Sequence, residues 1–318
     1  MSNLIETAKN NGEKRYHIFS NHSVYSLLKN CELRWRNKKQ TSLELFSKNV
    51  KDPSDLIELF GLDVEMFKGK FVQAILGAGH EYNEIRTLHS SSLLALLCFY
   101  NVSALHPLHC SIDSKNVFFT ESLFEIQNPI PGSDRPSNID VVLIGKDELS
   151  GRKVSLFLES KFSEYLTHGE KDKISTPVYR DIYHRLKKTL DSIGVNYDEY
   201  SENYSRLLYK EKHSTHYLEG VKQIVSHFLG VRSVATDERA KSEDIYLGEI
   251  LYKFPDEVDT KHRKYNDYTQ IYKTLAAGLN SIADSKFKVV SQCFTYQDVF
   301  KSFDLDDAVR AFYSLPID

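Results

Sequence analysis

The residues of this sequence best suited to chemistry are a carboxylate and an ammonium two positions apart, Glu159 and Lys161, at the end of a strand-like run over 154–162. Side chains alternate across a strand, so Glu159 and Lys161 leave on the same face. Three apolar residues leave on the opposite face: Val154, Leu156 and Leu158. The sequence therefore predicts a carboxylate beside an ammonium on a strand whose other face is buried.

A second carboxylate, Asp140, stands near the start of the preceding strand-like run, 139–144. The segment 145–152 joins the two runs and is short enough to close an antiparallel hairpin. Such a hairpin places Asp140 opposite roughly residue 157, with a register uncertain by about two residues. Asp140 then lies directly or diagonally across from Glu159, near enough for the two carboxylates to bind one cation.

Two carboxylates on neighbouring strands suit a magnesium site, because Mg²⁺ takes hard oxygen ligands and keeps several waters. We therefore expect Asp140 and Glu159 to bind Mg²⁺, with Mn²⁺ able to substitute. Phosphodiester hydrolysis needs a positioned water and a sink for charge on the phosphate, and a bound metal supplies both. Lys161 would orient that water or stabilise the developing negative charge.

The elements that must position these residues follow from the period of the apolar residues. They are a helix at 80–100, strands at 117–126, 139–144 and 154–162, a helix at 217–229 ended by Gly230, and a strand at 244–254. The α-β-β-β-α-β order predicts an α/β (α+β) fold with a central mixed sheet flanked by helices.

Further elements are expected on both sides of this core. Helices are predicted at 20–37, 54–76, 178–213 and 263–283, a strand at 287–293, and short helices near 296–303 and 305–314. We expect residues 1–76 to form a helical N-terminal extension packed on one domain, 77–318. A tyrosine-rich helical insertion at about 162–215 carries no run of one charge sign, so it suits packing or substrate gating.

The spacing of the site residues resembles that of a known superfamily. Asn138-Ile139-Asp140, followed after eighteen residues by Glu159-Ser160-Lys161, resembles the D-(x)n-(D/E)xK signature of the PD-(D/E)XK phosphodiesterases, which include restriction and repair nucleases. The α-β-β-β-α-β order is also that of the superfamily core. One departure is that the proline of the superfamily name appears only as Pro136, four residues before Asp140.

Within this superfamily, four segments resemble a bacterial subgroup described as restriction endonucleases. They are Gly77-Ala78-Gly79-His80-Glu81, His89-Ser90-Ser91-Ser92, the run 159–165, and Gly220-Val221-Lys222-Gln223. The resemblance covers roughly residues 77–293 and implies a restriction-endonuclease-like core. It also implies a metal-dependent DNA endonuclease with Asp140, Glu159 and Lys161 in its active site.

The resemblance implies further site residues on two helices. An acidic residue of the first core helix often joins the metal ligands in this superfamily, which favours Glu81, with Glu84 in reserve. Either carboxylate also suits a helix N-terminus without any catalytic role. Gln223 and His227 share one helix face and resemble the QxxxY element, with histidine in place of tyrosine. We expect Gln223 to complete the site, and Glu84, Lys222 and His227 are candidate substrate-binding residues, although His227 also suits a structural role.

The charge of the chain is unevenly distributed. The formal net charge of −3 does not favour nucleic-acid binding, but residues 1–50 carry nine Lys or Arg against four Asp or Glu. The densest part of this segment runs from Arg34 to Lys39 and surrounds the single tryptophan with cations. Arg34, Trp35 and Arg36 are therefore candidates for phosphate contact and base stacking, and a solvated helix end is the alternative.

The partners and the location follow from the same observations. The resemblance implies a nucleic-acid substrate, expected to be double-stranded DNA, and cleavage of both strands at one site predicts a homodimer. The longest apolar run, 93–100, has eight residues, and the N-terminus lacks the pattern of a secretory signal. We therefore expect no membrane association and a cytoplasmic location. The four cysteines lack zinc-site spacing and are expected to be reduced.

Two other functions agree with parts of the sequence. A nucleic-acid-binding protein on the same fold that no longer cleaves would fit the acidic balance of the chain. A glycosidase would use two carboxylates as general acid and base. In that mechanism, however, Lys161 beside Glu159 has no evident role.

Overall fold

The protein is described here by a computed structural model. The residues that the structure describes are 56–57, 60–78, 90–162, 164–166, 173–199, 201–210, 218–235, 242–254, 264–283, 286–313 and 315–316. Among them, no helix combines the length and the apolar character that crossing a membrane requires.

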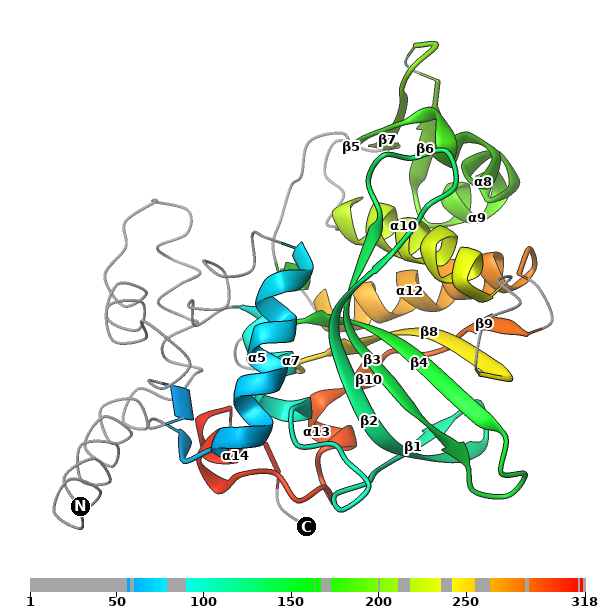
Figure 1. The fold of residues 1–318 in the computed structure, drawn as a ribbon. Helices are drawn as coiled ribbons and strands as arrows, with labels where there is room; N and C mark the ends of the chain where they lie inside the picture. The colour runs from blue at the N-terminus through cyan, green and yellow to red at the C-terminus, as the bar shows by residue number, and fades with distance from the viewer. Residues whose placement is uncertain are drawn as a thin grey trace, which may run out of the picture.

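A central mixed sheet organises the molecule (Figure 1). Its strands are β1 (Leu108–Ile112), β2 (Lys115–Asn128), β3 (Ser137–Asp147), β4 (Lys153–Lys161), β8 (Asp244–Leu251), β9 (Phe287–Val289) and β10 (Phe294–Thr295). The order is β1-β2-β3-β4-β8-β10, and β9 also pairs with β8. Strands β1 to β4 are antiparallel neighbours, whereas β8 runs parallel to β4, β9 and β10. The predicted mixed sheet is confirmed.

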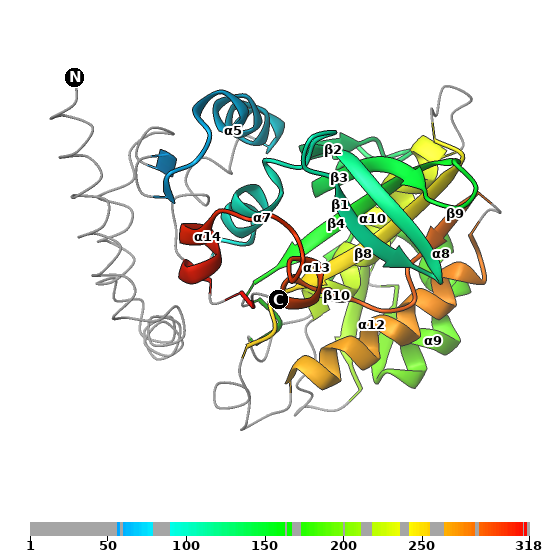
Figure 2. The ribbon, with the colours of Figure 1, turned by 90° about the horizontal axis from the view of Figure 1, so that it is seen from below.

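Helices cover both faces of this sheet, as Figure 2 shows from below. One face carries α5 (Val64–Ala78), α7 (Ser91–Phe99), α13 (Tyr296–Val299) and α14 (Asp307–Phe312). The other face carries α10 (Leu218–Ala235) and α12 (Lys264–Asn280). Each face has its own apolar core, the first around α5 and α7 and the second around α10 and α12.

Strand β4 shows how the sequence divides its side chains between these two cores. Val154, Leu156 and Leu158 are buried in the first core, whereas Phe157 is buried in the second. Since side chains alternate, Glu159 and Lys161 share the face of Phe157 and lie beneath α10 and α12. The alternation predicted from the sequence is confirmed, and it directs both charged groups to the face covered by α10.

The insertion differs from its prediction. The stretch 178–213 was expected to be helical. In the part of it that the structure describes, the only helices besides the end of a 3-10 turn at Pro177–Tyr179 are α8 (Arg180–Arg185) and α9 (Lys187–Ser192), and another 3-10 turn lies at Glu164–Leu166. A second, antiparallel sheet has the order β5 (Lys173–Ser175), β7 (Ser205–Tyr209), β6 (Val195–Asp198). Gly194 ends α9 with φ +74°, a conformation in which glycine is unstrained, and β6 and β7 then bury Val195 and Leu207 in the second core. The spacing of the tyrosines was therefore not a helical signal.

Other boundaries differ by smaller amounts. The expected helix at 54–76 is interrupted at Gly61, which has φ +68°, so α5 begins only at Val64. Within the expected helix 80–100, the structure describes α7 from Ser91 onwards, and 79–89 lie outside the described residues. Helix α10 does not end at Gly230 but continues to Ala235.

Of the N-terminal extension, α5 packs against β2, where Lys70 donates a hydrogen bond to the carbonyl of Ser122. Residues 1–55, with the expected helix 20–37, lie outside the described part.

Candidate active site

The register between β3 and β4 brings the two predicted carboxylates together. Val141 pairs with Leu158, and one further step of this antiparallel register sets Asp140 opposite Glu159. The expected partner was residue 157 within two positions, so the observed register lies at the edge of that range. The Oδ2 atom of Asp140 accepts a 2.6 Å hydrogen bond from the backbone N–H of Ser160. This bond orients the Asp140 carboxylate along the end of β4.

Two further acidic residues extend this pair across the sheet. Glu249 of β8 is the register partner of Glu159. Glu125 of β2 lies between the pairs Phe124–Val141 and Ile126–Ile139, and is therefore opposite Asp140. Four acidic residues thus occupy one level of four neighbouring strands, which we call the acidic row: Glu125, Asp140, Glu159 and Glu249.

Neither end of the acidic row was identified from the sequence. Glu249 is 1% exposed, and Tyr268 of α12 donates a 2.8 Å hydrogen bond to its Oε2. Glu125 is 4% exposed and has φ +50°, a strained value for a residue with a side chain, and Asn138 donates a 2.5 Å hydrogen bond to it. The available signal for Glu249 was a carboxylate inside the otherwise apolar run 245–251, after Asp244 at the start of the strand.

Lys161 connects the acidic row to helix α10. Its ammonium donates a 2.6 Å hydrogen bond to Oε1 of Glu159 and a 2.7 Å hydrogen bond to the side-chain oxygen of Gln223. Lys161 is only 2% exposed, so both bonds form away from bulk water. Three residues predicted to share a site, one of them on a helix more than sixty residues away, are therefore in direct contact.

His227 reaches the other oxygen of Glu159. Its Nε2 lies 2.9 Å from Oε2 of Glu159, and both side chains are buried. The contact has the distance of an ion pair but not the alignment of a hydrogen bond. Lys222 is partly exposed on the same helix, and within the described part of the chain nothing links it to this group. The structure thus brings His227 to Glu159 but does not bring Lys222 to it.

The carboxyl groups of the acidic row differ in the direction in which their pKa values are shifted. Burial alone would raise the pKa of Glu159, but the charges of Lys161 and His227 outweigh it and lower the pKa to about 2. The pKa of Asp140 is raised by burial and by the nearby carboxylates of Glu159 and Glu125, against the opposing effect of Lys161. Burial also raises the pKa of Glu249, to about 7. The row therefore holds more acidic groups than its nearby cations neutralise.

Several oxygen atoms of this group are suited to a hard cation. Oε2 of Glu159 and Oε1 of Glu249 are buried and accept no hydrogen bond in the structure as described. An added positive charge would favour ionisation of Asp140, whose pKa is raised by burial and by the nearby carboxylates. Within the described ranges, however, no three Asp, Glu, His or Cys side chains converge closely enough to hold a metal ion by themselves. The carboxylates present fit part of a Mg²⁺ site that needs further oxygen ligands.

Five predicted site residues belong to segments outside the described part of the chain. Glu81 and Glu84, the candidate ligands of the first core helix, lie outside the described residues, as do Arg34, Trp35 and Arg36. Their predicted roles stay predictions.

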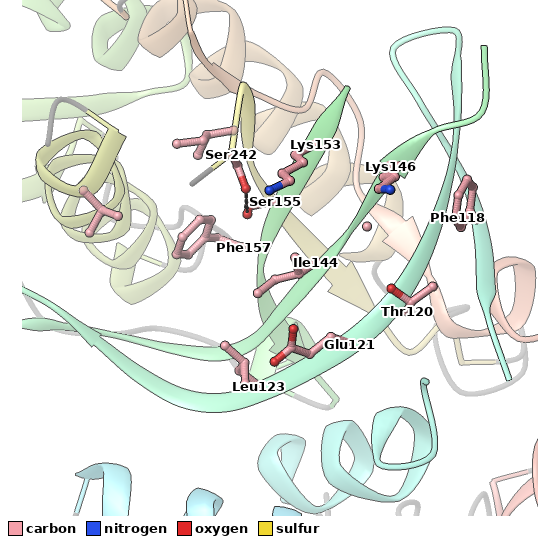
Figure 3. A pocket seen from close by; sticks show the side chains of 13 residues that line it. Phe118, Thr120, Glu121, Leu123, Ile144, Lys146, Lys153, Ser155, Phe157 and Ser242 are labelled. Atoms are coloured by element: carbon pink, nitrogen blue, oxygen red, sulfur yellow. Dashed lines mark hydrogen bonds between the residues drawn. The ribbon is translucent and has the colours of Figure 1, made fainter. Parts of the chain in front are cut away.

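A separate pocket of about 690 Å³ opens at the opposite end of β4 (Figure 3). Its apolar wall includes Leu123, Ile144 and Phe157, and Lys146 and Lys153 lie at its edge. None of the predicted site residues lines it. The pocket is therefore distinct from the acidic row.

Comparison with known proteins agrees with this geometry. The family model described as "Restriction Endonuclease associating with ARP" matches residues 72–287, which is more than half of the chain. No curated protein and no solved structure matches the chain. The matched segment contains the acidic row, Lys161, Gln223 and His227. The chain therefore belongs to the family of restriction endonucleases associating with ARP.

Proposed function

We propose that this protein is a Mg²⁺-dependent DNA endonuclease that hydrolyses the phosphodiester backbone at the acidic row. The observation that carries the proposal is the position of Lys161 on β4, the strand next to that of Asp140. Its ammonium donates hydrogen bonds to Glu159 on the same strand and to Gln223 on helix α10. A lysine held in this way between a carboxylate and an amide is oriented by two acceptors. An ammonium fixed in this way suits a role that needs the charge at one defined place beside the substrate.

Each residue has a proposed role. Asp140 and Glu159 would hold Mg²⁺, or Mn²⁺ in its place, and a bound metal would supply Lewis acidity and a water of lowered pKa. Lys161 would orient the attacking water or stabilise the negative charge that develops on the phosphate. Gln223 would keep the Lys161 ammonium in place through its 2.7 Å hydrogen bond.

The finer points of this function are also proposals. Membership of a restriction-endonuclease family supports a nucleic-acid substrate, and we propose double-stranded DNA. Because one active site of this type cuts one strand at a time, we propose that a homodimer cuts both strands. Glu81 is the proposed third acidic ligand, Arg34, Trp35 and Arg36 are proposed DNA contacts, and the proposed location is cytoplasmic.

One observation favours a second candidate, a nucleic-acid-binding protein that does not cleave. Glu159 and Lys161 are 5% and 2% exposed, so little of either group faces a substrate directly. Asp140, in contrast, is partly exposed. The binding candidate predicts DNA binding without metal-dependent turnover. The glycosidase alternative finds no support in the matched family.

The test is cleavage of supercoiled plasmid, linear duplex and single-stranded DNA with Mg²⁺ or Mn²⁺. Wild type is compared with Asp140→Asn, Glu159→Gln and Lys161→Ala, and with Lys146→Ala, an exposed lysine of the same sheet, as the matched control. Metal-dependent cutting that is lost in the first three variants and kept in the control would support the proposal. Cutting retained by Glu159→Gln would refute it, and DNA binding without cutting by the wild type would favour the second candidate.

A further inference from the structure

A buried serine contacts the histidine of the site from the side away from Glu159. Ser137 is the first residue of β3, and its hydroxyl lies 2.7 Å from Nδ1 of His227. Ser137 and His227 are 1% and 5% exposed. With Nε2 of His227 2.9 Å from Glu159, the three side chains form a continuous buried chain from the start of β3 to the acidic row.

We infer that Ser137 is a positioning residue of this active site, which acts through His227 to hold the carboxylate of Glu159 in one orientation. The inference rests on the proposed function, since it assigns Glu159 to the site. It gives Ser137 a role that neither its residue type nor the D-(x)n-(D/E)xK spacing indicates.

The argument begins with the two nitrogen atoms of the imidazole. A histidine whose Nε2–H faces a carboxylate needs a partner at Nδ1, which is an acceptor in the neutral ring and a donor in the charged ring. A serine hydroxyl can donate or accept, so Ser137 satisfies Nδ1 in either case. The ring is then fixed at both ends, and it cannot turn about its side-chain bonds without losing a contact.

The backbone is arranged to allow this contact. A Cβ atom at Gly230 of α10 would lie 2.6 Å from Cβ of Ser137 and 3.1 Å from the carbonyl oxygen of Asn128. Helix α10 therefore approaches the start of β3 at a distance that only glycine permits. Gly230 follows His227 by three positions and lies on the same helix face. The approach allowed by Gly230 is the approach that brings His227 to Ser137.

The result is that each oxygen of Glu159 has a close neighbour, one from the same strand and one from helix α10. Lys161 bonds Oε1 at 2.6 Å, and His227 faces Oε2 at 2.9 Å. A carboxylate held at both oxygens presents a fixed plane to the neighbouring Asp140. Residues that orient a metal-binding carboxylate in this way affect metal affinity without touching the metal.

The experiment measures Mn²⁺ affinity by calorimetry and, separately, kcat and KM for DNA cleavage. Variants are Ser137→Ala, Ser137→Cys, His227→Ala and the double variant Ser137→Ala/His227→Ala. The matched control is Ser122→Ala, because Ser122 is an equally buried serine of β2 that donates its 2.8 Å hydrogen bond to the carbonyl of Phe99, away from the acidic row. Melting temperatures identify any variant that fails to fold.

Ser137→Ala is expected to weaken Mn²⁺ binding and lower kcat by about tenfold or more, with an unchanged KM for DNA. Ser137→Cys, which keeps the size and a weak hydrogen bond, should recover part of the loss. Because Ser137 acts through His227, the double variant should lose no more than His227→Ala alone. The Ser122→Ala control should leave Mn²⁺ affinity and kcat unchanged.

Other outcomes separate the two proposals. Wild-type Mn²⁺ affinity in both Ser137 variants would overturn the inference, and so would losses that add in the double variant. If the wild-type protein binds Mn²⁺ but cuts no DNA, the proposed function fails. The calorimetric comparison then still decides whether Ser137 positions Glu159.

Discussion

The ammonium of Lys161 lies 2.6 Å from Oε1 of Glu159, and both side chains are almost completely buried. Burying two charges costs more desolvation free energy than a single ion pair regains, unless further hydrogen bonds satisfy both groups. Here Gln223 accepts a further hydrogen bond from Lys161, and His227 lies at ion-pair distance from the second oxygen of Glu159. A buried ion pair with this much support is consistent with selection for a function rather than for stability.

Removal of the Lys161 charge should therefore be costly in two ways. Lys161→Met keeps much of the side-chain volume but leaves Glu159 buried without its main counter-charge, which should lower the free energy of unfolding by about 3 kcal/mol. Cleavage should fall by a factor on the order of 100 to 1,000. Urea unfolding and plasmid cleavage measure the two effects, and Glu159→Gln/Lys161→Met should recover stability but not activity. Unchanged cleavage by Lys161→Met at saturating metal would show that Lys161 has no catalytic role.

Gln223 should matter less than Lys161, because it acts on the ammonium only through one hydrogen bond. Gln223→Ala removes the 2.7 Å bond and should lower kcat about tenfold, since hydrogen bonds to charged groups contribute about 1.5–3 kcal/mol. Steady-state cleavage kinetics provide the measurement. Ser226→Ala is the control, because this residue of the same helix bonds Tyr179 and not the acidic row. Equal kinetics in wild type and Gln223→Ala would argue against an orienting role.

Glu249 should make the stability of the metal-free protein depend on pH. Burial raises its pKa from the usual 4.5 to about 7, so the folded state binds more protons than the unfolded state between these values. The free energy of unfolding should therefore fall as the pH rises from about 4.5 to 7, by roughly 3 kcal/mol for this group. Glu249→Gln keeps an acceptor for Tyr268 and should flatten this dependence. Urea unfolding in chelator at several pH values tests it, and a wild-type slope in the variant would assign the dependence to other groups.

The core of the site could be predicted from the sequence because its determinants are local. Glu159 and Lys161 are on one strand, where alternation fixes their common face, and Asp140 is on the strand joined to it by a short loop. A hairpin limits the possible registers to a few, so the predicted partner of Asp140 was only two residues from the observed one. The helix bearing Gln223 was found through its four-residue spacing to His227, together with the family resemblance.

The ends of the acidic row could not be predicted, because they depend on pairing between segments far apart in the chain. Glu249 meets Glu159 through a parallel pair of strands separated by the whole insertion and α10. Glu125 faces Asp140 through the register between β2 and β3, and its sequence gives no signal for the φ of +50° that it adopts within the strand. The strands of the insertion were missed for a similar reason, since Val195 and Leu207 reveal their role only once they pack in the second core.

Gly230 was wrongly predicted to end a helix, and its true role in the close approach of α10 to β3 can be tested by substitution. It was expected to end a helix, but α10 continues past it, and a Cβ at this position would approach Ser137 within 2.6 Å. Gly230→Ala should therefore destabilise the protein by about 1–3 kcal/mol through overpacking, despite the better helix propensity of alanine. The control is Gly69→Ala in α5, where a Cβ would meet no atom within 4 Å. That substitution should stabilise the protein by about 0.5–1 kcal/mol, because alanine favours the helix. Thermal and urea unfolding of the two variants should thus change in opposite directions, and a stabilised Gly230→Ala would show that α10 and β3 have room to separate.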